Sequence, residues 1–219
     1  MPTDRELSQL AARLYEGSPA GVRLTQRYRP RICPFQPLLE QLHPGMRLLD
    51  IGCGSGLFAG LAAILRGPLD IFGVDVSRGA IEAARRMAQQ DEVAASGSRV
   101  NFLAVEDTGG WPRELFDAVS MIDVLHHVPR REQRGFVLEA YSRVKPGGRL
   151  LYKDMVSAPL WRVAANQMHD LVLARQWVRT APLDEVRRWL ETAGARILGT
   201  SRENRLWYGH EFLFAERRE

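Results

Sequence analysis

Apolar positions in the first third of the chain follow a helical spacing. From Leu7 to Leu14 they recur every three or four residues, which is typical of one face of an amphipathic helix. The Gly-Ser-Pro sequence at 17–19 breaks this pattern. Residues 1–30 are therefore predicted to form one or two polar helices, with a short helix leading into Phe35–Leu42.

From residue 46 onward, short apolar runs alternate with helical segments. The predicted strands are Met46–Ile51, Asp70–Val74, Val100–Val105, Phe116–Ile122 and Arg149–Asp154. The predicted helices are Gly56–Arg66, Ser77 to about Gln90, and Arg131–Val144. This alternation indicates βαβ units and a parallel sheet.

The alternation of short apolar runs and helical segments ends after Asp154. Residues 158–179 have a helical pattern, and Pro182 is predicted to open another helix that ends near Ala193, with Gly194 as its C-terminal cap. Arg196–Thr200 and Leu206–Phe214 are predicted to be closing strands. Because only a hairpin-sized connection separates them, they are expected to be antiparallel.

Composition narrows the class of protein. The 219 residues are 45% apolar and 26% charged, as in ordinary globular domains. No apolar run approaches the ~20 residues of a membrane-spanning helix, and the first ten residues do not resemble a secretory signal, so we expect a cytoplasmic protein. Two cysteines cannot form a disulfide framework or supply a four-ligand zinc site. The net charge of +4 includes no dense basic run, so no nucleic-acid partner is expected, although an acidic substrate or carrier protein would be attracted.

A glycine cluster after the first predicted strand is the most informative motif. Gly52, Gly54 and Gly56 stand at alternate positions between the strand and the next helix, where the chain must turn sharply and a ligand can approach the backbone. The spacing differs from the G-x-G-x-x-G fingerprint of dinucleotide sites. Asp50, just before the loop, would repel a diphosphate but suit a cation. We therefore predict a nucleoside ligand that carries an amino acid.

Two further carboxylates follow the next two strands. Asp75 ends the second strand, 19 residues after Gly56, where a carboxylate can accept hydrogen bonds from both hydroxyls of a ribose. Asp107 occupies the corresponding place after the third strand and can accept from an adenine amino group. Both positions fit an adenosine.

These features resemble the class I S-adenosylmethionine-dependent methyltransferases. Five segments match that family's motifs in order: Leu48–Gly56, Gly73–Ser77, Asp107, Phe116–Val119 with Leu125–Val128, and Lys145–Leu150. They cover residues 44–156. The resemblance implies a doubly wound, Rossmann-like α/β fold with a mostly parallel seven-stranded sheet in the order 3-2-1-4-5-7-6, strand 7 being antiparallel.

The resemblance also implies a division of the chain and a cofactor. We expect one methyltransferase domain over 1–219, with a helical cap (1–43), a cofactor-binding core (44–156), a helical insertion on the substrate side (157–194) and closing strands (195–219). The implied cofactor is S-adenosylmethionine, with S-adenosylhomocysteine as its product and no metal. The implied cofactor-binding residues are Asp50, Gly52, Cys53, Gly54, Gly56, Asp75, Val76, Asp107, Thr108 and Ile122.

The acceptor is expected to be a small molecule, of aromatic or polyketide type, either free or tethered to an acidic acyl carrier protein. A hydroxyl acceptor benefits from a base, and the candidate bases are His126, His127 and His169. One histidine of the 126–127 pair is expected only to brace its loop. The candidate acceptor-binding residues are Tyr28, Arg31, Trp161, Arg175 and Trp177.

Two alternatives stay open at this stage. The chain could methylate RNA or protein, although it lacks the Asn/Asp-Pro-Pro-Tyr signature of methylation at base amino groups; the fourth strand ends Met121-Ile122-Asp123-Val124 instead. It could also bind the cofactor without turning it over.

Overall fold

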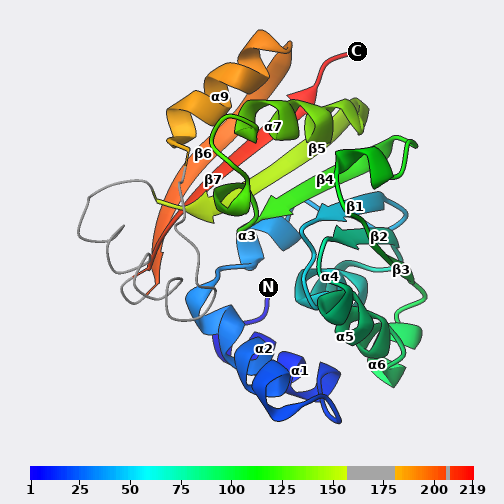
Figure 1. Ribbon diagram of the computed structural model, residues 1–219. Helices are drawn as coiled ribbons and strands as arrows, with labels where there is room; N and C mark the ends of the chain where they lie inside the picture. Colours follow the sequence, from blue (N-terminus) through cyan, green and yellow to red (C-terminus); the bar gives the residue numbers. More distant parts are fainter. Residues whose placement is uncertain (157–180, 206–207) are drawn as a thin grey trace. The chain divides into compact units, whose positions relative to one another are not determined.

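A computed structural model describes residues 1–156, 181–205 and 208–219 (Figure 1). These residues form two compact units, Met1–Pro112 and Arg113–Glu219. The strands make a seven-stranded sheet in the order β3-β2-β1-β4-β5-β7-β6, which confirms the predicted topology. Among the described helices, none combines the length and the apolar character needed to cross a bilayer.

The first unit begins with the predicted polar helices. Helix α1 (Asp4–Leu14) starts at a capping box between Thr3 and Glu6, and its Leu7, Ala11 and Leu14 are buried. After the 17–19 break come α2 (Ala20–Ile32) and the short α3 (Gln36–Leu39). Helix α1 packs against both α2 and α4 (Leu57–Arg66).

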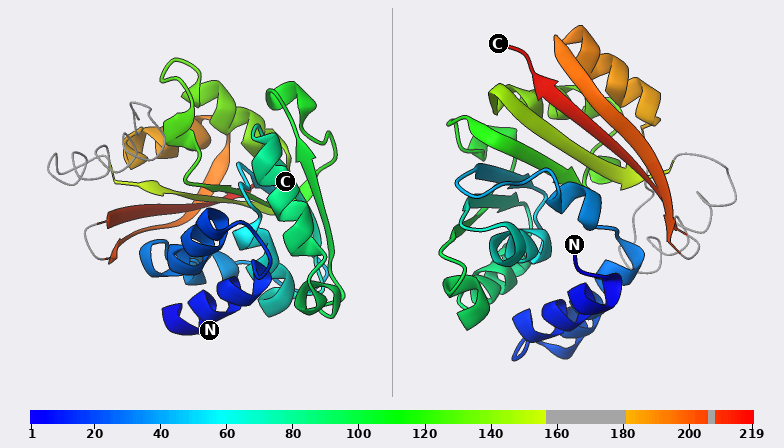
Figure 2. Two further views of the ribbon diagram at one scale, coloured as in Figure 1. Left: turned by 60° about the horizontal axis from the view of Figure 1, so that its bottom comes forward. Right: turned by 180° about the vertical axis from the view of Figure 1, so that it is seen from behind.

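Three parallel strands form the sheet of the first unit. They are β1 (Arg47–Ile51), β2 (Asp70–Asp75) and β3 (Arg99–Ala104), with β2 between the other two. Helices α4 and α5 (Arg78–Ala88) pack on the strands, and α6 (Asp91–Ala94) packs on both helices (Figure 2). Leu48, Leu49 and Ile71 are fully buried beneath them. Because β1 and β2 are paired and parallel, the loops that follow them begin next to each other.

The described residues of the second unit include the strands β4 to β7 and the helices α7 and α9. Strand β4 (Phe116–Ile122) is parallel to β5 (Val144–Met155), and α7 (Gln133–Ser142) connects them. Helix α9 (Leu183–Thr192) precedes β6 (Ala195–Arg205) and β7 (Tyr208–Arg217). Strand β7 is antiparallel to both β5 and β6, as predicted for the closing strands.

Several predicted boundaries were wrong. Strand β5 begins at Val144 rather than Arg149, because Val144 already pairs with Phe116 and the Pro-Gly-Gly sequence forms an irregularity within the strand. Helix α7 is shorter than predicted at both ends, and Pro182 is the residue before α9 rather than its first residue. The short α6 was not anticipated. The helical pattern over 158–179 lies outside the described residues.

Candidate functional site

The glycine loop leaves β1 through three left-handed backbone conformations. The φ angles of Gly52, Gly54 and Gly56 are 72°, 54° and 84°, a region that glycine adopts without a steric penalty. The amides of Gly52 and Cys53 both donate to the carbonyl of Val74 on β2, at 2.8 and 3.1 Å. The loop is thus fixed to the end of the neighbouring strand.

Asp75 joins the glycine loop to the start of α5. One carboxylate oxygen accepts from the Gly54 amide at 2.8 Å, and the other accepts from the Ser77 amide at 2.8 Å. Ser77 in turn caps α5, because its hydroxyl accepts from the Ala80 amide at 3.2 Å. Each carboxylate oxygen has a second lone pair, so Asp75 keeps acceptor capacity for the hydroxyls of a ligand.

The glycines serve two different purposes. A Cβ on Gly56 would lie 2.8 Å from the Phe102 ring, and one on Gly73 would lie 2.5 Å from the same ring. These two glycines allow the strands and helices to pack closely. A Cβ on Gly54, by contrast, would meet nothing within 4 Å. The backbone at Gly54, which donates to Asp75, is therefore open to a ligand.

The electrostatic environment of the loop is negative. Asp50 is almost completely buried at the end of β1. The pKa of the buried Cys53 thiol is raised above its usual value, first by burial and then by the carboxylates of Asp50 and Asp75. The same two carboxylates would stabilise a cationic ligand and repel a diphosphate. The donor set therefore fits S-adenosylmethionine, whose sulfonium and amino groups are positive.

Two exposed features follow β2 and β3. Val76 directly follows it and is 72% exposed, which is unusual for a large apolar side chain. Asp107 is exposed beyond β3 and caps a short 3₁₀ turn, η1 (Thr108–Gly110), by accepting from the Gly109 amide at 2.8 Å. Thr108 opens that turn. Val76, Asp107 and Thr108 thus lie in the loops after β2 and β3. Their contact with a cofactor stays a prediction.

Tyr15 is a contact with the loop that sequence reasoning missed. It lies at the end of α1 with no exposed surface, and its hydroxyl donates to the Ser55 carbonyl at 2.6 Å. Burial raises the pKa of Tyr15, so the hydroxyl keeps its proton. A signal was present in the sequence: Tyr15 immediately follows the apolar stripe of α1, and a buried tyrosine hydroxyl usually has a hydrogen-bond partner.

Replacing Tyr15 by phenylalanine is expected to weaken S-adenosylhomocysteine binding about fivefold. The hydroxyl holds the Ser55 carbonyl between Gly54 and Gly56, and a lost hydrogen bond of this kind is worth about 1 kcal/mol. Titration calorimetry measures the change. Tyr28→Phe is the matched control, because Tyr28 is 45% exposed on α2 and should leave the affinity unchanged. Equal affinities for wild type and Tyr15→Phe would contradict the expectation.

In the second unit, the end of β4 is held by an ion pair between a partly buried aspartate and a buried lysine. Ile122 closes the strand and is nearly buried, and the next residue, Asp123, has a φ of 52°. Both oxygens of Asp123 accept from the ammonium of Lys153 on β5, at 2.6 and 2.7 Å. Lys153 is completely buried. The pair therefore fixes a backbone conformation that is uncommon for a residue with a side chain.

The two adjacent histidines differ sharply in their surroundings. Both belong to a short 3₁₀ turn, η2 (Leu125–His127), that follows β4. His126 is buried, and its Nδ1 lies 2.5 Å from an oxygen of the buried Asp154 near the end of β5. His127 is exposed, with its ring centroid 4.1 Å from that of His126. The two histidines are thus brought together with a carboxylate that the sequence analysis did not single out.

Further buried polar groups line β5 and β7. Burial raises the pKa of Tyr152, and the charges of Asp154, Glu211 and Asp123 add to this effect. Burial also raises the pKa of Glu211, while Arg202, 2.7 Å away, lowers it. His210 lies within β7, as expected, and is buried. In the described part of the chain, no three His, Cys, Asp or Glu side chains are arranged to hold a metal ion.

The residues predicted to bind the acceptor fall into two groups. Tyr28 and Arg31 lie on α2, where the Arg31 guanidinium sits 5.2 Å from the centre of the Tyr28 ring. Trp161, Arg175 and Trp177 lie outside the described residues, and so does His169, the third candidate base.

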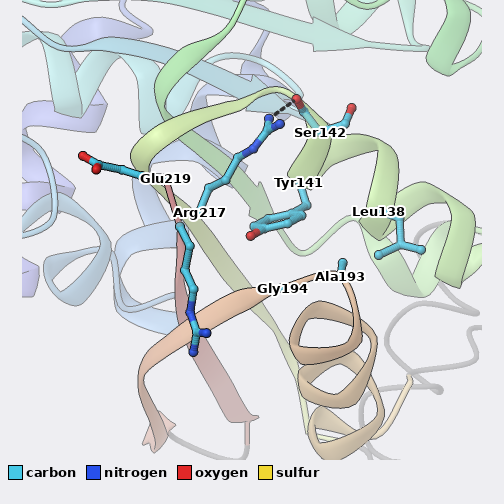
Figure 3. Close-up of a pocket in the computed structure, with 8 residues that line it drawn as sticks. Leu138, Tyr141, Ser142, Ala193, Gly194, Arg217 and Glu219 are labelled. Carbon is cyan, nitrogen blue, oxygen red and sulfur yellow. Dashed lines mark hydrogen bonds between the residues drawn. The ribbon is translucent and has the colours of Figure 1, made fainter.

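A surface cavity of about 460 Å³ lies elsewhere in the second unit (Figure 3). Tyr141 on α7, Gly194 after α9 and Arg217 on β7 are among its lining residues, and Arg217 donates to the Ser142 carbonyl at 2.8 Å. The cavity is next to Val144, at the amino end of β5, whereas His126, Asp123 and Asp154 lie at the carboxyl ends of β4 and β5. Ligands of open α/β sheets bind at the carboxyl ends. This cavity is therefore not the candidate site.

Known proteins are similar to this chain in sequence and in fold. The family model for a methyltransferase domain matches residues 24–199. A ubiquinone biosynthesis O-methyltransferase from Alkalilimnicola ehrlichii is 30% identical over 161 residues, which cover 68% of this chain and 60% of that protein. A ribosomal protein L11 methyltransferase from Ralstonia pickettii is 34% identical over 135 residues, which cover 62% of this chain and 40% of that protein. The chain thus spans about half the length of these curated relatives.

Among solved structures, a magnesium protoporphyrin IX methyltransferase from Synechocystis PCC 6803 with bound SAH has a TM-score of 0.71. It is 22% identical in sequence, and the match covers 94% of this chain and 91% of that one. The fold is that of the class I S-adenosylmethionine-dependent methyltransferases. The chain belongs to the methyltransferase-domain family, as the extent of the family match shows.

Proposed function

We propose that this chain transfers the methyl group of S-adenosylmethionine to a hydroxyl oxygen of a small, aromatic or polyketide-type acceptor. The observation that carries the proposal is the arrangement around Asp75. Its carboxylate is held by the Gly54 and Ser77 amides, beside an open backbone at Gly54 and in a negative field. This arrangement suits an adenosine that carries a cationic amino acid.

Most of the residues that would hold the cofactor belong to the first unit. Asp75 would accept from the ribose hydroxyls, Asp107 from the adenine amino group, and the exposed Val76 would cover apolar adenine surface. Asp50 would favour the cationic end. The further residues that the resemblance implies at the cofactor are Gly52, Cys53, Gly56, Thr108 and Ile122. When bound, S-adenosylmethionine supplies a methyl carbon on a positive sulfur, which leaves as a neutral thioether when a nucleophile takes the methyl group.

The choice of a hydroxyl acceptor is supported by a relative and by the histidines after β4. The first relative is named as an O-methyltransferase of ubiquinone biosynthesis. His126 and His127 lie at the carboxyl end of β4, and an imidazole can remove the proton of a hydroxyl acceptor. Tyr28 and Arg31 present an aromatic ring and a cation that suit an aromatic acceptor with an acidic group.

The test is turnover with a defined set of acceptors. Purified chain would be incubated with methyl-labelled S-adenosylmethionine and, in separate reactions, catechol-type phenols, ribosomal protein L11 and transfer RNA. The proposal expects label in the phenols and none in the macromolecules. Label in L11 or RNA alone would replace the proposed acceptor class. Binding of S-adenosylhomocysteine without any turnover would instead indicate a cofactor-binding module.

An acidic carrier protein that presents the acceptor is a further part of the proposal. Helix α2 bears four arginines at positions 23, 27, 29 and 31 and no acidic residue. If a carrier docks on such arginines, the Michaelis constant for carrier-bound acceptor should rise steeply between low and physiological salt, because exposed charges are screened. Steady-state kinetics at several NaCl concentrations measures this dependence. A Michaelis constant that does not change with salt would favour a free acceptor.

A further inference from the structure

The cavity between the ends of α7, α9 and β7 is lined by a tyrosine whose hydroxyl has no protein partner in the described part of the chain. Tyr141 is only 7% exposed, and its side chain forms part of the cavity wall. No described residue forms a hydrogen bond with its hydroxyl, whereas the hydroxyl of Tyr15 donates to a carbonyl. Tyrosine hydroxyls in such surroundings usually have a partner. The hydroxyl of Tyr141 can therefore bond to a ligand in the cavity.

Two guanidinium groups lie near the same hydroxyl. Burial raises the pKa of Tyr141, and the positive charges of Arg217 and Arg218 act against this shift, so both charges are close to the phenol oxygen. Both arginines line the cavity, and Figure 3 shows the Tyr141 hydroxyl turned toward the side on which Arg217 lies. Among the described residues, neither guanidinium forms an ion pair with a carboxylate. Unpaired cations beside a hydroxyl donor favour an anionic ligand.

Arg217 is fixed by main-chain carbonyls. Its Nη1 donates to the carbonyl of Ser142, the last residue of α7, at 2.8 Å and to that of Val144 at 2.7 Å. These bonds use the two hydrogens of Nη1 and leave those of Nε and Nη2 for a ligand. They also offset the partial negative charge at the carboxyl end of α7, which would otherwise oppose an anion. A side chain held in this way loses little freedom when a ligand binds.

The other walls of the cavity are mainly small or apolar. Leu138 on α7 and Ala193 after α9 line it, and a Cβ on Gly194 would meet nothing within 4 Å, so the backbone there is open. Glu219 also lines the cavity and contributes the opposing charge. The volume of about 460 Å³ lies within the range of small-molecule sites. The cavity therefore combines an anion-binding side with room for an apolar group.

We propose that this cavity is a second ligand site, which binds a small aromatic carboxylate. The carboxylate accepts from the guanidinium groups of Arg217 and Arg218, whose planar shape matches its two oxygens, and from the Tyr141 hydroxyl. The aromatic ring of the ligand packs against Tyr141 and Leu138. Because the cavity lies at the amino end of β5, this site is separate from the proposed site of methyl transfer and does not depend on the identity of the methyl acceptor.

The experiment is an NMR titration of the full, nitrogen-15-labelled chain with benzoate. We expect saturable shifts of the Gly194 amide and of the Arg217 Nε–H, with a dissociation constant on the order of 1 mM, as for other small fragments. Benzyl alcohol has the ring without the charge, and acetate has the charge without the ring. Each should bind at least about tenfold more weakly than benzoate. Acetate or inorganic phosphate that binds as tightly as benzoate would overturn the proposed ligand class.

Two variants locate the site. Tyr141→Phe and Arg218→Gln should each weaken benzoate binding about fivefold, because each removes a donor to the carboxylate, while the melting temperature stays close to that of wild type. Arg134→Gln is the matched control, since Arg134 is an exposed arginine of α7 that does not line the cavity, and its affinity should equal that of wild type. Shifts that do not saturate, shifts at Gly54 in place of Gly194, or wild-type affinity in both variants would overturn the proposal.

Discussion

Replacing Asp75 by alanine is expected to weaken S-adenosylhomocysteine binding about 100-fold. The carboxylate would accept from the ribose hydroxyls, and hydrogen bonds to a charged group are each worth about 1.5–3 kcal/mol. The same carboxylate holds the Gly54 amide at 2.8 Å, so its loss also releases the loop that approaches the ligand. A loss of about 2.7 kcal/mol corresponds to the expected factor. Titration calorimetry at fixed pH and salt measures it.

Asp70→Ala is the control for this experiment. Asp70 begins the same strand, β2, that Asp75 ends, and it pairs with Arg47 and Arg99 at 3.2 and 3.3 Å. It lies at the amino end of the strand, away from the glycine loop. Its removal should leave the affinity within about twofold of wild type. An Asp75→Ala variant that binds as tightly as Asp70→Ala would show that Asp75 does not contact the ligand.

Replacing Lys153 by methionine is expected to lower the free energy of unfolding by about 3–5 kcal/mol. The substitution leaves the Asp123 carboxylate without the ammonium that contacts both of its oxygens, and breaking a buried pair in this way has a large cost. For a chain of this size the melting temperature should fall by about 10 °C. Thermal unfolding followed by circular dichroism measures the change.

Lys145→Met is an internal comparison on the same strand. Lys145 pairs with Asp117 at 2.9 Å, but the two side chains are 38% and 31% exposed. Such a pair contributes about 1 kcal/mol or less. Replacing Asp123 by leucine together with Lys153→Met should recover part of the lost stability, because no unpaired charge stays buried. Equal melting temperatures for Lys153→Met and Lys145→Met would contradict this account of the pair.

The features that were predictable from sequence are those with a local cause. The strands β1, β2 and β4 are short runs of mainly apolar residues, and the left-handed turns at Gly52, Gly54 and Gly56 follow from glycine spacing. Strand order came from the family resemblance rather than from periodicity. The start of β5 was misplaced because a Pro-Gly-Gly sequence ordinarily ends an element, whereas here it lies inside the paired strand.

The side-chain pairs of the second unit could not be predicted in this way. Lys153 meets Asp123, and Asp154 meets His126, across sequence separations of 30 and 28 residues. Lys153 and Asp154 are adjacent on β5. The register between β4 and β5 decides which residue of the loop after β4 each of them contacts. The contact between Tyr15 and Ser55 depends likewise on how α1 packs against α4. Such contacts are set by tertiary packing, not by residue type alone.

The most direct test uses titration calorimetry to compare how the wild-type chain binds two adenosine-containing ligands. S-adenosylhomocysteine carries an amino acid with a cationic ammonium, and NAD⁺ carries a diphosphate in the corresponding place. Our account predicts saturable binding of S-adenosylhomocysteine at micromolar concentrations and no measurable heat with NAD⁺. Tight binding of NAD⁺, or no response to S-adenosylhomocysteine, would contradict it.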